Sequence, residues 1–300
     1  MEAQRLAGKV VVITGASSGF GKGAARRFAE HGARLVLAAR RGPLLEDLAR
    51  ECEAAGGQAV AQAADVSQRA DVERIAATAV GEFGRIDVWV NNAGVGALGP
   101  FEHVPLDDHV KVIETNLLGT LFGSYLAYRR FLEQGAGVLI NVASELGRHT
   151  VPYYASYVAA KHGVVGLSDS LRQEIQQKAL LHVHVCTVMP TAHDTPFFDH
   201  AANYTGHVVR APAPLHDPEN VVETIVRLAQ DPKDREIVGA DGVVKILMKQ
   251  LLPPVAEKMV AAQMHRTQME TAPPGPNSPG AVQSPIAAGT EVRAGRRDRR

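Results

Sequence analysis

Residues 14–21 read Thr-Gly-Ala-Ser-Ser-Gly-Phe-Gly and stand between two segments of different periodicity. The β-branched run over residues 9–14 predicts a buried strand, and the spacing of small apolar residues over 21–31 predicts a helix. Glycines at such a junction permit positive φ angles and let backbone amides approach a phosphate at the positive end of a helix dipole. The stretch is therefore either a pyrophosphate-binding loop or an ordinary strand-to-helix turn.

Strand-like and helix-like segments alternate from this stretch to about residue 240. Strands are expected over residues 9–14, 34–39, 58–63, 86–90, 137–142, 182–188 and 236–238. Helices are expected over residues 21–31, 43–55, 69–83, 106–133, 154–177 and 218–230. Apolar strands separated by helices indicate a parallel sheet covered on both faces. We therefore predict a single α/β domain over residues 1–240, a Rossmann-like doubly wound sheet with ligands at the carboxyl ends of its strands.

Composition and charge argue against several classes of protein. The 300 residues include 32 basic and 32 acidic side chains, so no net charge favours nucleic acid or an anionic membrane. Residues 1–8 hold no apolar stretch typical of a secretory signal, and no run approaches the ~20 apolar residues of a membrane span. The two cysteines, Cys52 and Cys186, fit free thiols in a reducing compartment. A cytoplasmic protein is expected.

Two segments follow the alternating region. Residues 241–266 predict an amphipathic helical extension with a basic flank, broken at Pro253 and Pro254. This extension either packs beside the substrate cleft, joins a subunit interface, or attaches the protein peripherally to a membrane. Residues 267–300 are rich in proline, glycine and serine and end in arginines, which predicts a disordered tail.

Tyr157 and Lys161 stand four residues apart in the helix predicted over 154–177, so their side chains share one face. A free phenol titrates near pH ~10, and a neighbouring ammonium group lowers the pKa of a tyrosine. Such a pair is able to exchange protons near neutral pH, although the same spacing also occurs in ordinary surface pairs.

Two further polar residues stand where chemistry is expected. Ser144 follows the strand predicted over 137–142, where its hydroxyl either donates to a substrate carbonyl or caps a helix. Asn116 lies inside the helix predicted over 106–133, where asparagine is a poor helix former and is costly if buried unpaired. Asn116 therefore requires a polar partner, structural or catalytic.

The end of the second strand bears on which nicotinamide cofactor the glycine loop would bind. Many dinucleotide-binding folds place an acidic residue there for the ribose hydroxyls of NAD, whereas a basic residue accommodates the 2′-phosphate of NADP. This chain has Arg40 and Arg41, and no acid appears before Glu46. NADP(H) is favoured, unless both arginines are simply solvated charges.

Taken together, these residues resemble the short-chain dehydrogenase/reductase (SDR) family, in its shorter subfamily with a TGxxxGxG loop. The resemblance spans about residues 8–238 and includes the Asn91-Asn92-Ala93-Gly94 segment after the fourth strand. It implies a catalytic set of Asn116, Ser144, Tyr157 and Lys161. It implies a cofactor-binding set of Gly15, Ser17, Ser18, Gly19, Phe20, Gly21, Arg40, Arg41, Asp65, Val66, Asn92, Ala93, Gly94, Tyr157, Lys161, Pro190 and Thr195. It implies no metal.

The resemblance also implies a role for each catalytic residue. Tyr157 is the general acid in reduction. Lys161 holds the nicotinamide ribose and lowers the pKa of Tyr157, while Ser144 orients the carbonyl. Asn116 anchors a water that relays protons to Lys161. Hydride passes directly between nicotinamide and the carbonyl carbon, and a homodimer or homotetramer is expected.

Further implied contacts concern the adenosine half of the cofactor and the cleft. They are Asp65 and Val66 at the adenine, Asn92 and Gly94 in the cleft, and Ser17 and Arg40 at the 2′-phosphate.

The chain departs from the family after the sixth strand, where residues 190–195 read Pro-Thr-Ala-His-Asp-Thr in place of Pro-Gly-x-Val-x-Thr. Thr191 lacks the permissive backbone of glycine, and His193 replaces an aliphatic residue. We expect the cofactor contact through Pro190 and Thr195 to persist with altered local geometry. His193 is either a second acid or a packing or substrate-lining residue.

His182 and His184 share one side of a strand, but no third ligand has a suitable spacing for a metal site. They are expected to be structural.

The leading hypothesis is an NADP(H)-dependent oxidoreductase that interconverts a carbonyl and an alcohol. Its rival is a non-catalytic NADP(H)-sensing regulator on the same fold, which would not need the four catalytic residues together. An epimerase or dehydratase of the longer relatives would carry a different glycine spacing and a sugar-binding region. The substrate pocket is expected from residues 145–154 and 193–214, whose rings favour an apolar or aromatic substrate. These rings include Phe197, Phe198, His200, Tyr204 and His207.

Overall fold

The computed structural model describes residues 6–251 and 253–297. Residues 1–5, 252 and 298–300 lie outside the described residues, and with them the start of the predicted domain and the last arginines of the predicted tail. Within the described part, no helix is long and apolar enough to span a bilayer.

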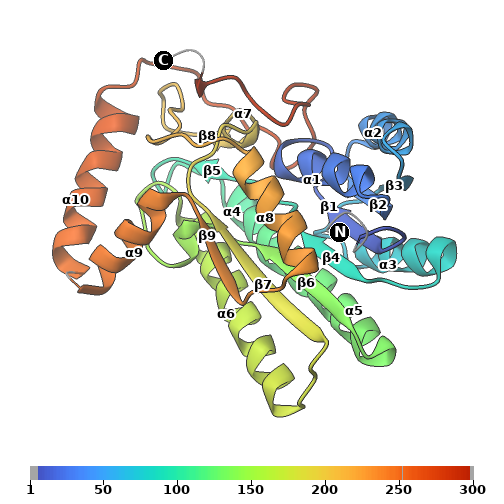
Figure 1. Cartoon of the computed structure of the whole chain (residues 1–300). Helices are drawn as coiled ribbons and strands as arrows, with labels where there is room; N and C mark the ends of the chain where they lie inside the picture. The colour runs from blue at the N-terminus through green and yellow to red at the C-terminus, as the bar shows by residue number, and fades with distance from the viewer. Residues whose placement is uncertain (1–5, 252, 298–300) are drawn as a thin grey trace.

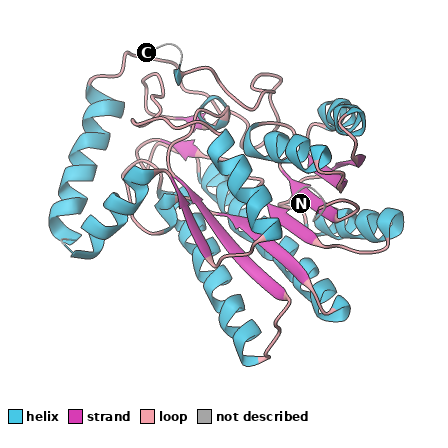
Figure 2. Ribbon diagram, in the orientation of Figure 1, coloured by secondary structure: helices cyan, strands magenta, loops and turns pink. Residues whose placement is uncertain are grey.

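A seven-stranded parallel sheet forms the centre of the domain, in the order β3-β2-β1-β4-β6-β7-β9 (Figures 1 and 2). Its strands are β1 (Val10–Thr14), β2 (Arg34–Ala39), β3 (Gln58–Ala63), β4 (Val88–Asn91), β6 (Gly137–Val142), β7 (Val183–Pro190) and β9 (Arg235–Val238). The strand order reverses between β1 and β4, since β1 pairs with β2 on one side and with β4 on the other. This is the doubly wound, Rossmann-like topology that the alternation of segments predicts, and its ligand crevice lies where the order reverses.

Alternate residues of each strand pack against helices on opposite faces of the sheet. Val11 and Ile13 belong to one core with the first, second and eighth helices, whereas Val10 and Val12 belong to another with the third, fifth and sixth. These helices are α1 (Gly19–Glu30), α2 (Gly42–Ala54), α8 (Glu219–Gln230), α3 (Arg69–Phe83), α5 (Gly119–Gln134) and α6 (Ala155–Gln177). Burial on both faces explains why the strands read as nearly continuous apolar runs.

The helix predicted over residues 106–133 is interrupted near its middle. α4 (Leu106–Ile113) continues through a π-helical turn, Glu114–Leu118, into α5. Turns of this width are rare and recur at functional sites. Asn116 lies in this turn, fully buried, and has the polar partner that its burial requires. Its Oδ1 accepts from the amide of Val95 at 2.9 Å, and its Nδ2 donates to the Val95 carbonyl at 2.8 Å.

The extension consists of α9 (Ala240–Leu251) and α10 (Pro253–His265), separated where the prolines predict a break. Ile246 of α9 is buried, and His265 at the end of α10 hydrogen-bonds to the Tyr153 hydroxyl just before α6. Both helices border the larger cavity described below.

The segment after α10 follows a defined course as far as residue 297, in contrast to the disorder predicted from its composition. It runs from α10 across the molecule to α1, where the Gly19 amide donates to the carbonyl of Glu291 at 3.0 Å (Figure 1). Arg293 and Arg297 form ion pairs with Asp217 at 3.0 and 2.9 Å. Composition underestimates order here because the arginines of the tail meet acidic side chains of the domain.

Candidate functional site

A cavity of about 320 Å³ lies at the carboxyl edge of the sheet, between the glycine loop and the helical extension. A second cavity of about 100 Å³ shares Gly15, Ser18, Ala93 and Gly94 with it. Most site residues predicted from the sequence line one cavity or both: Gly15, Ser17, Ser18, Gly19, Phe20, Arg40, Arg41, Asp65, Val66, Asn92, Ala93, Gly94, Ser144, Tyr157, Lys161, Pro190 and Thr195. Asn116 and Gly21 pack behind these walls.

The glycine loop lies in direct backbone contact with the end of β4. Gly15 has a φ of +68°, and a Cβ atom there would lie 2.7 Å from the Cα of Ala93. A Cβ on Gly21 would lie 2.6 Å from Nδ2 of Asn92, an amide that donates to the Thr14 carbonyl at 3.0 Å. Side chains at positions 15 and 21 would therefore push the loop away from the strand.

A buried polar network fixes β4 directly below this contact. The side-chain amide of Asn91 donates to Asn141 at 2.9 Å and to Ser124 at 3.1 Å, and its oxygen accepts from the Trp89 indole at 2.7 Å. Asn141 in turn donates to Ser168 at 3.0 Å. The network joins β4 and β6 to α5 and α6, so it holds the helix that carries Tyr157 against the strand that leads to the larger cavity.

Tyr157 and Lys161 lie in the first two turns of α6 and both border the larger cavity. Burial raises the pKa of Tyr157 to about 12, although its hydrogen bond with Ser144 acts in the opposite direction. The prediction that this pKa lies below its ordinary value is wrong, because burial is the largest effect on the phenol. The Lys161 ammonium donates to the Val142 carbonyl at 2.8 Å and lies over the Tyr157 ring, 5.6 Å from its centroid. The phenol is therefore protonated at neutral pH.

Lys161 is 4% exposed, and burial lowers the pKa of its ammonium group to about 8. Within residues 6–251 and 253–297 it has no carboxylate at ion-pair distance. A Cβ on Gly94 would lie 3.8 Å from its Nζ and 3.0 Å from Oδ1 of Asn116. The structure thus brings Lys161, Gly94 and Asn116 together.

Ser144 begins the short 3₁₀ helix Glu145–Gly147, and its oxygen accepts from the Leu146 amide at 3.1 Å. It is a cap, and its hydroxyl also forms the hydrogen bond with Tyr157 described above. Asn116 is different, because both polar atoms of its side chain bond to Val95. A water at Asn116 would have to bind its main-chain carbonyl, which also accepts from Thr120 at 2.8 Å.

The smaller cavity is bordered by two half-buried arginines at the end of β2. The Arg41 guanidinium donates to the hydroxyls of Ser17 at 3.1 Å and Ser18 at 2.9 Å, which orient it toward the glycine loop. Burial lowers the pKa of both Arg40 and Arg41, yet guanidinium groups stay charged in proteins. Both are therefore charged groups rather than freely solvated ones.

Asp65 lies on the opposite wall of this cavity. Its carboxylate accepts from the Lys111 ammonium at 2.9 Å and from the Ser67 hydroxyl at 2.8 Å. Burial raises the pKa of Asp65, but these donors outweigh burial and leave the pKa below its ordinary value. Lys111 is a residue that the sequence did not single out, because an isolated lysine on a helix carries no signal of its own.

The loop after β7 accommodates both of its unusual residues. Thr191 fits because the facing position is glycine: a Cβ on Gly242 would lie 2.6 Å from Cγ2 of Thr191. The Thr191 hydroxyl donates to the Val238 carbonyl at 3.2 Å. His193 is 3% exposed, its Nδ1 bonds to the Thr191 carbonyl, and burial lowers the pKa of its imidazole. It lines the larger cavity as a neutral side chain, as the packing or lining alternative expects.

The rest of the larger cavity is walled mainly by apolar side chains. They are Leu146, Val151, Tyr154, Phe197, Phe198, Val260 and Met264. The prediction that Tyr204 and His207 belong to this wall is not met, because Tyr204 bonds to Asp108 and His207 bonds to Thr205.

Lys245 of α9 is a wall residue that the sequence did not assign. Its ammonium group lies 3.2 Å from Glu145 and 2.7 Å from Asp241, so it ties the extension to the residue after Ser144. The four-residue spacing of Asp241 and Lys245 in the predicted helix was the sequence feature that could have indicated their ion pair.

The family model described as short chain dehydrogenase matches residues 9–204. The chain belongs to the short-chain dehydrogenase/reductase family. This SDR is 34% identical over 287 residues to the uncharacterized oxidoreductase YxnA of Bacillus subtilis, an alignment that covers 94% of this chain and 80% of YxnA. It is 37% identical over 187 residues to the D-threitol dehydrogenase of Mycolicibacterium smegmatis, covering 62% of this chain and 71% of that enzyme.

Solved structures agree with this assignment. A metagenomic SDR in complex with NADP aligns with a TM-score of 0.66 and 31% identity, covering 78% of this SDR and 98% of the other chain. An SDR of Burkholderia phymatum in complex with NAD aligns with a TM-score of 0.75 over 84% of this chain and 96% of that one. At 24% identity the second comparison supports the fold alone.

The close fit of Thr191 against Gly242 predicts a stability effect. Gly242→Ala should lower the free energy of unfolding by about 1–3 kcal/mol, because the new methyl group overlaps Cγ2 of Thr191. Adding Thr191→Ser removes Cγ2 and should restore most of the loss, as measured by urea unfolding. Gly81→Ala is the matched control, since that helical glycine faces open space. Strictly additive effects of the two changes would contradict the contact.

Proposed function

We propose that this SDR is an NADP(H)-dependent oxidoreductase that interconverts a carbonyl compound and the corresponding alcohol, with Tyr157 as the general acid and base. The observation that carries the proposal is the common border of one cavity. Tyr157, Ser144 and Lys161 line the same cavity as the glycine loop. A proton donor and a nucleotide-binding loop are thus presented to the same enclosed space.

The residues present fit a dinucleotide along both cavities. The loop approaches the residues after β4 too closely for side chains at Gly15 and Gly21, and it places backbone amides at the N-terminus of α1, a position that favours phosphate. Asn92, Ala93 and Gly94 would hold the middle of the cofactor, with Lys161 and Thr195 at the nicotinamide end. Arg40, Arg41, Asp65 and Val66 would hold the adenosine end. When bound, the nicotinamide supplies or accepts the hydride.

The side chains of the cleft would donate the proton that accompanies hydride transfer. The Ser144 hydroxyl would donate to the carbonyl oxygen of the substrate and hold it beside Tyr157. The protonated phenol would then transfer its proton to that oxygen as negative charge develops there. The phenolate that remains would be stabilised by the Lys161 ammonium across the ring face. Oxidation of an alcohol would use the same groups in reverse.

The apolar walls support a substrate that is itself largely apolar. The cavity volume of about 320 Å³ suits a small molecule, and relatives include proteins named diacetyl reductase and D-threitol dehydrogenase. We also expect a homodimer or homotetramer. A non-catalytic, cofactor-sensing role is the second candidate, but it gives no reason for Ser144, Tyr157 and Lys161 to border one cavity.

Tyr157→Phe should lower kcat for carbonyl reduction by about 10²–10⁴-fold, because the ring still fills its place but the transferable proton is gone. NADPH affinity should stay near the wild-type value, whereas Lys161→Ala should weaken both turnover and NADPH binding. Steady-state kinetics and NADPH titration measure the two effects. Tyr128→Phe on α5, far from the cleft, is the matched control. Most of the activity surviving in Tyr157→Phe would refute the mechanism.

The rate of carbonyl reduction should fall as pH rises through about 8. Burial lowers the pKa of Lys161 to about 8, so the ammonium is charged below this pH and loses its proton above it. The phenolate product of proton transfer then loses its stabilising charge. The kcat/KM profile for reduction between pH 6 and 10 measures the effect. Lys161→Arg stays charged, so its residual activity should lack the decline; a wild-type rate that climbs through pH 9 would contradict this assignment.

NADPH should bind more tightly than NADH, because Arg40 and Arg41 offer the 2′-phosphate two positive charges that have no ion-pair partner among the described residues. One charge-assisted contact is worth about 1.5–3 kcal/mol, or one to two orders of magnitude in affinity. Fluorescence titration of both cofactors into wild type and Arg40→Asp measures the preference. Arg40→Asp should bind NADH at least as well as NADPH. Equal affinities in the wild type would overturn the proposed preference.

A further inference from the structure

Residues 281–291, here called the C-terminal strap, run along the outer side of the glycine loop. The strap begins beside Arg40 at the end of β2 and reaches Lys22 on α1, where Nζ donates to the Thr290 carbonyl at 3.1 Å. Lys22 also forms an ion pair with Glu291 at 3.4 Å. Two parts of the chain more than 240 residues apart therefore share the nucleotide end of the site.

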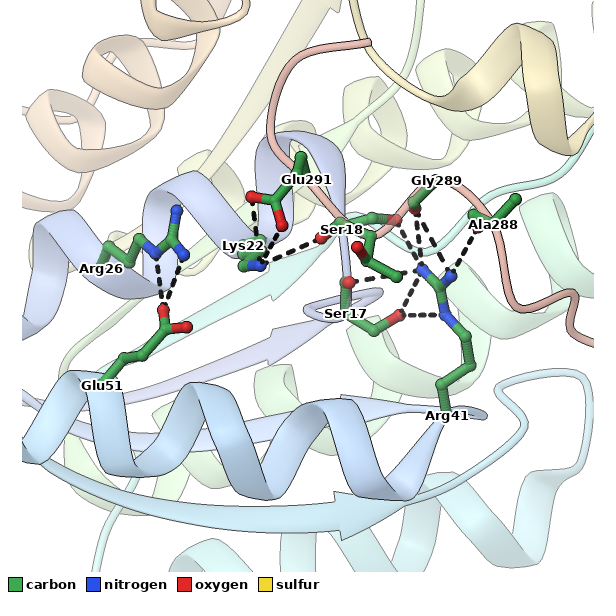
Figure 3. Close-up of polar contacts among 10 residues, drawn as sticks. Ser17, Ser18, Lys22, Arg26, Arg41, Glu51, Ala288, Gly289 and Glu291 are labelled. Carbon is green, nitrogen blue, oxygen red and sulfur yellow. Dashed lines mark hydrogen bonds and ion pairs between the residues drawn. The ribbon is translucent and has the colours of Figure 1, made fainter.

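The strap occupies the donors of both arginines assigned to the 2′-phosphate. Arg40 donates to the carbonyls of Ala281 and Val282, the second at 3.0 Å. Arg41 donates to the carbonyls of Ala288 at 3.1 Å and Gly289 at 3.4 Å. Figure 3 shows the Arg41 guanidinium between the hydroxyls of Ser17 and Ser18 on one side and the strap on the other.

These contacts give the arginines no carboxylate partner, although Asp65 acts on Arg40 over a longer distance. Among the described residues, neither Arg40 nor Arg41 has a carboxylate within ion-pair distance. Their partners are neutral carbonyls and hydroxyls, which accept weaker hydrogen bonds than an anion does. A phosphate dianion is a stronger ligand for this pair than the strap carbonyls, so the two compete for the same donors.

The strap also borders the smaller cavity, which the proposed function assigns to adenosine. Ala281, Pro285 and Ile286 form one wall of the 100 Å³ cavity, whose other walls include Asp65 and Val66. An adenosine without a 2′-phosphate has no need of Arg40 and Arg41. The strap also occupies the Gly19 amide, which donates to the Glu291 carbonyl at 3.0 Å, and this contact opposes NADP(H) and NAD(H) alike. The arginine contacts are the ones that distinguish the two cofactors.

The course of the strap is specified by its sequence. Gly289 has a φ of +68°, and a Cβ there would lie 2.8 Å from Cβ of Pro196. Beyond the strap, Arg293 and Arg297 both pair with Asp217, which anchors the segment to the start of α8. A glycine-dependent turn and a charged anchor are features of a docked segment rather than of a random tail.

We propose that the C-terminal strap is an internal competitor of the 2′-phosphate and sets how strongly this SDR discriminates NADP(H) from NAD(H). The inference rests on the proposed cofactor function. The docked strap holds Arg40 and Arg41 on its carbonyls and lowers the apparent affinity for NADP(H) by the fraction of time that it is docked. NADP(H) displaces the strap from Arg40, Arg41 and Gly19, whereas NAD(H) displaces it from Gly19 alone.

The test measures dissociation constants for NADPH and NADH in the full-length chain and three variants. Gly289→Val disrupts the strap turn, and the double variant Arg293→Glu/Arg297→Glu removes the anchor at Asp217 without touching the nucleotide cavities. Ala287→Val, on an exposed strap residue, is the matched control. Both disrupting changes should raise the preference for NADPH over NADH by about tenfold, as expected if the strap is docked about nine-tenths of the time. The control should keep the wild-type preference.

A second readout uses the reciprocity of coupled binding. NADPH should displace the strap in the wild type and speed trypsin cleavage after Arg293 and Arg296 more than NADH does. An unchanged preference for NADPH in both disrupting variants overturns the proposal. This holds even if the affinities for both cofactors fall equally, because the strap then does not distinguish between them. If the wild type and every variant bind neither dinucleotide, the proposed function itself is wrong.

Discussion

The architecture of the site depends on the backbone contact between the turn after β1 and the end of β4. Gly15 and Gly21 have no room for a Cβ atom, because Ala93 and Asn92 occupy the space that it would need. The contact brings the N-terminus of α1 beside the residues that follow β4, at the point where the order of strands reverses. Without this contact the two cavities would not share a wall, and a dinucleotide would have no continuous binding site.

The polar network around Asn91 extends this constraint to the chemical end of the cleft. Its bonds reach Asn141 on β6 and, through Asn141, Ser168 on α6. α6 carries Tyr157 and Lys161, and β6 leads directly to Ser144, so the network sets the position of these side chains relative to the glycine loop. Such a fully buried network is stable because each amide finds partners, and it specifies one arrangement of strands and helices.

Much of this was predictable from the sequence, because periodicity and turn chemistry are local. The alternation of segments predicted the seven strands of the large sheet, and the spacing of Tyr157 and Lys161 predicted that they share a helix face. The pKa of Tyr157 was predicted in the wrong direction, because the effect of a neighbouring lysine is visible in sequence but the degree of burial is not. The π-helical turn at Asn116 was also missed, since it depends on the pairing of that side chain with Val95.

The C-terminal region shows most clearly what the sequence alone does not predict. Composition describes residues 267–300 as a polar, proline-rich tail, and nothing local predicts that Arg293 meets Asp217 or that Arg40 meets carbonyls from residues 281 and 282. Long-range partners of this kind are decided by the folded domain. The same holds for Lys245, whose link to Glu145 joins segments about one hundred residues apart.

The proposed function requires one cleft that binds a dinucleotide beside a proton donor, so that hydride is transferred to a carbonyl. The most direct measurement follows deuterium from NADPH labelled at the transferable C4 position into the products of a panel of diketones, aliphatic ketones and aromatic ketones, by mass spectrometry. The account predicts that at least one carbonyl compound is reduced and that its alcohol carries one deuterium on the former carbonyl carbon. Tight NADPH binding with no labelled alcohol from any compound would contradict it and favour a protein that only senses the cofactor.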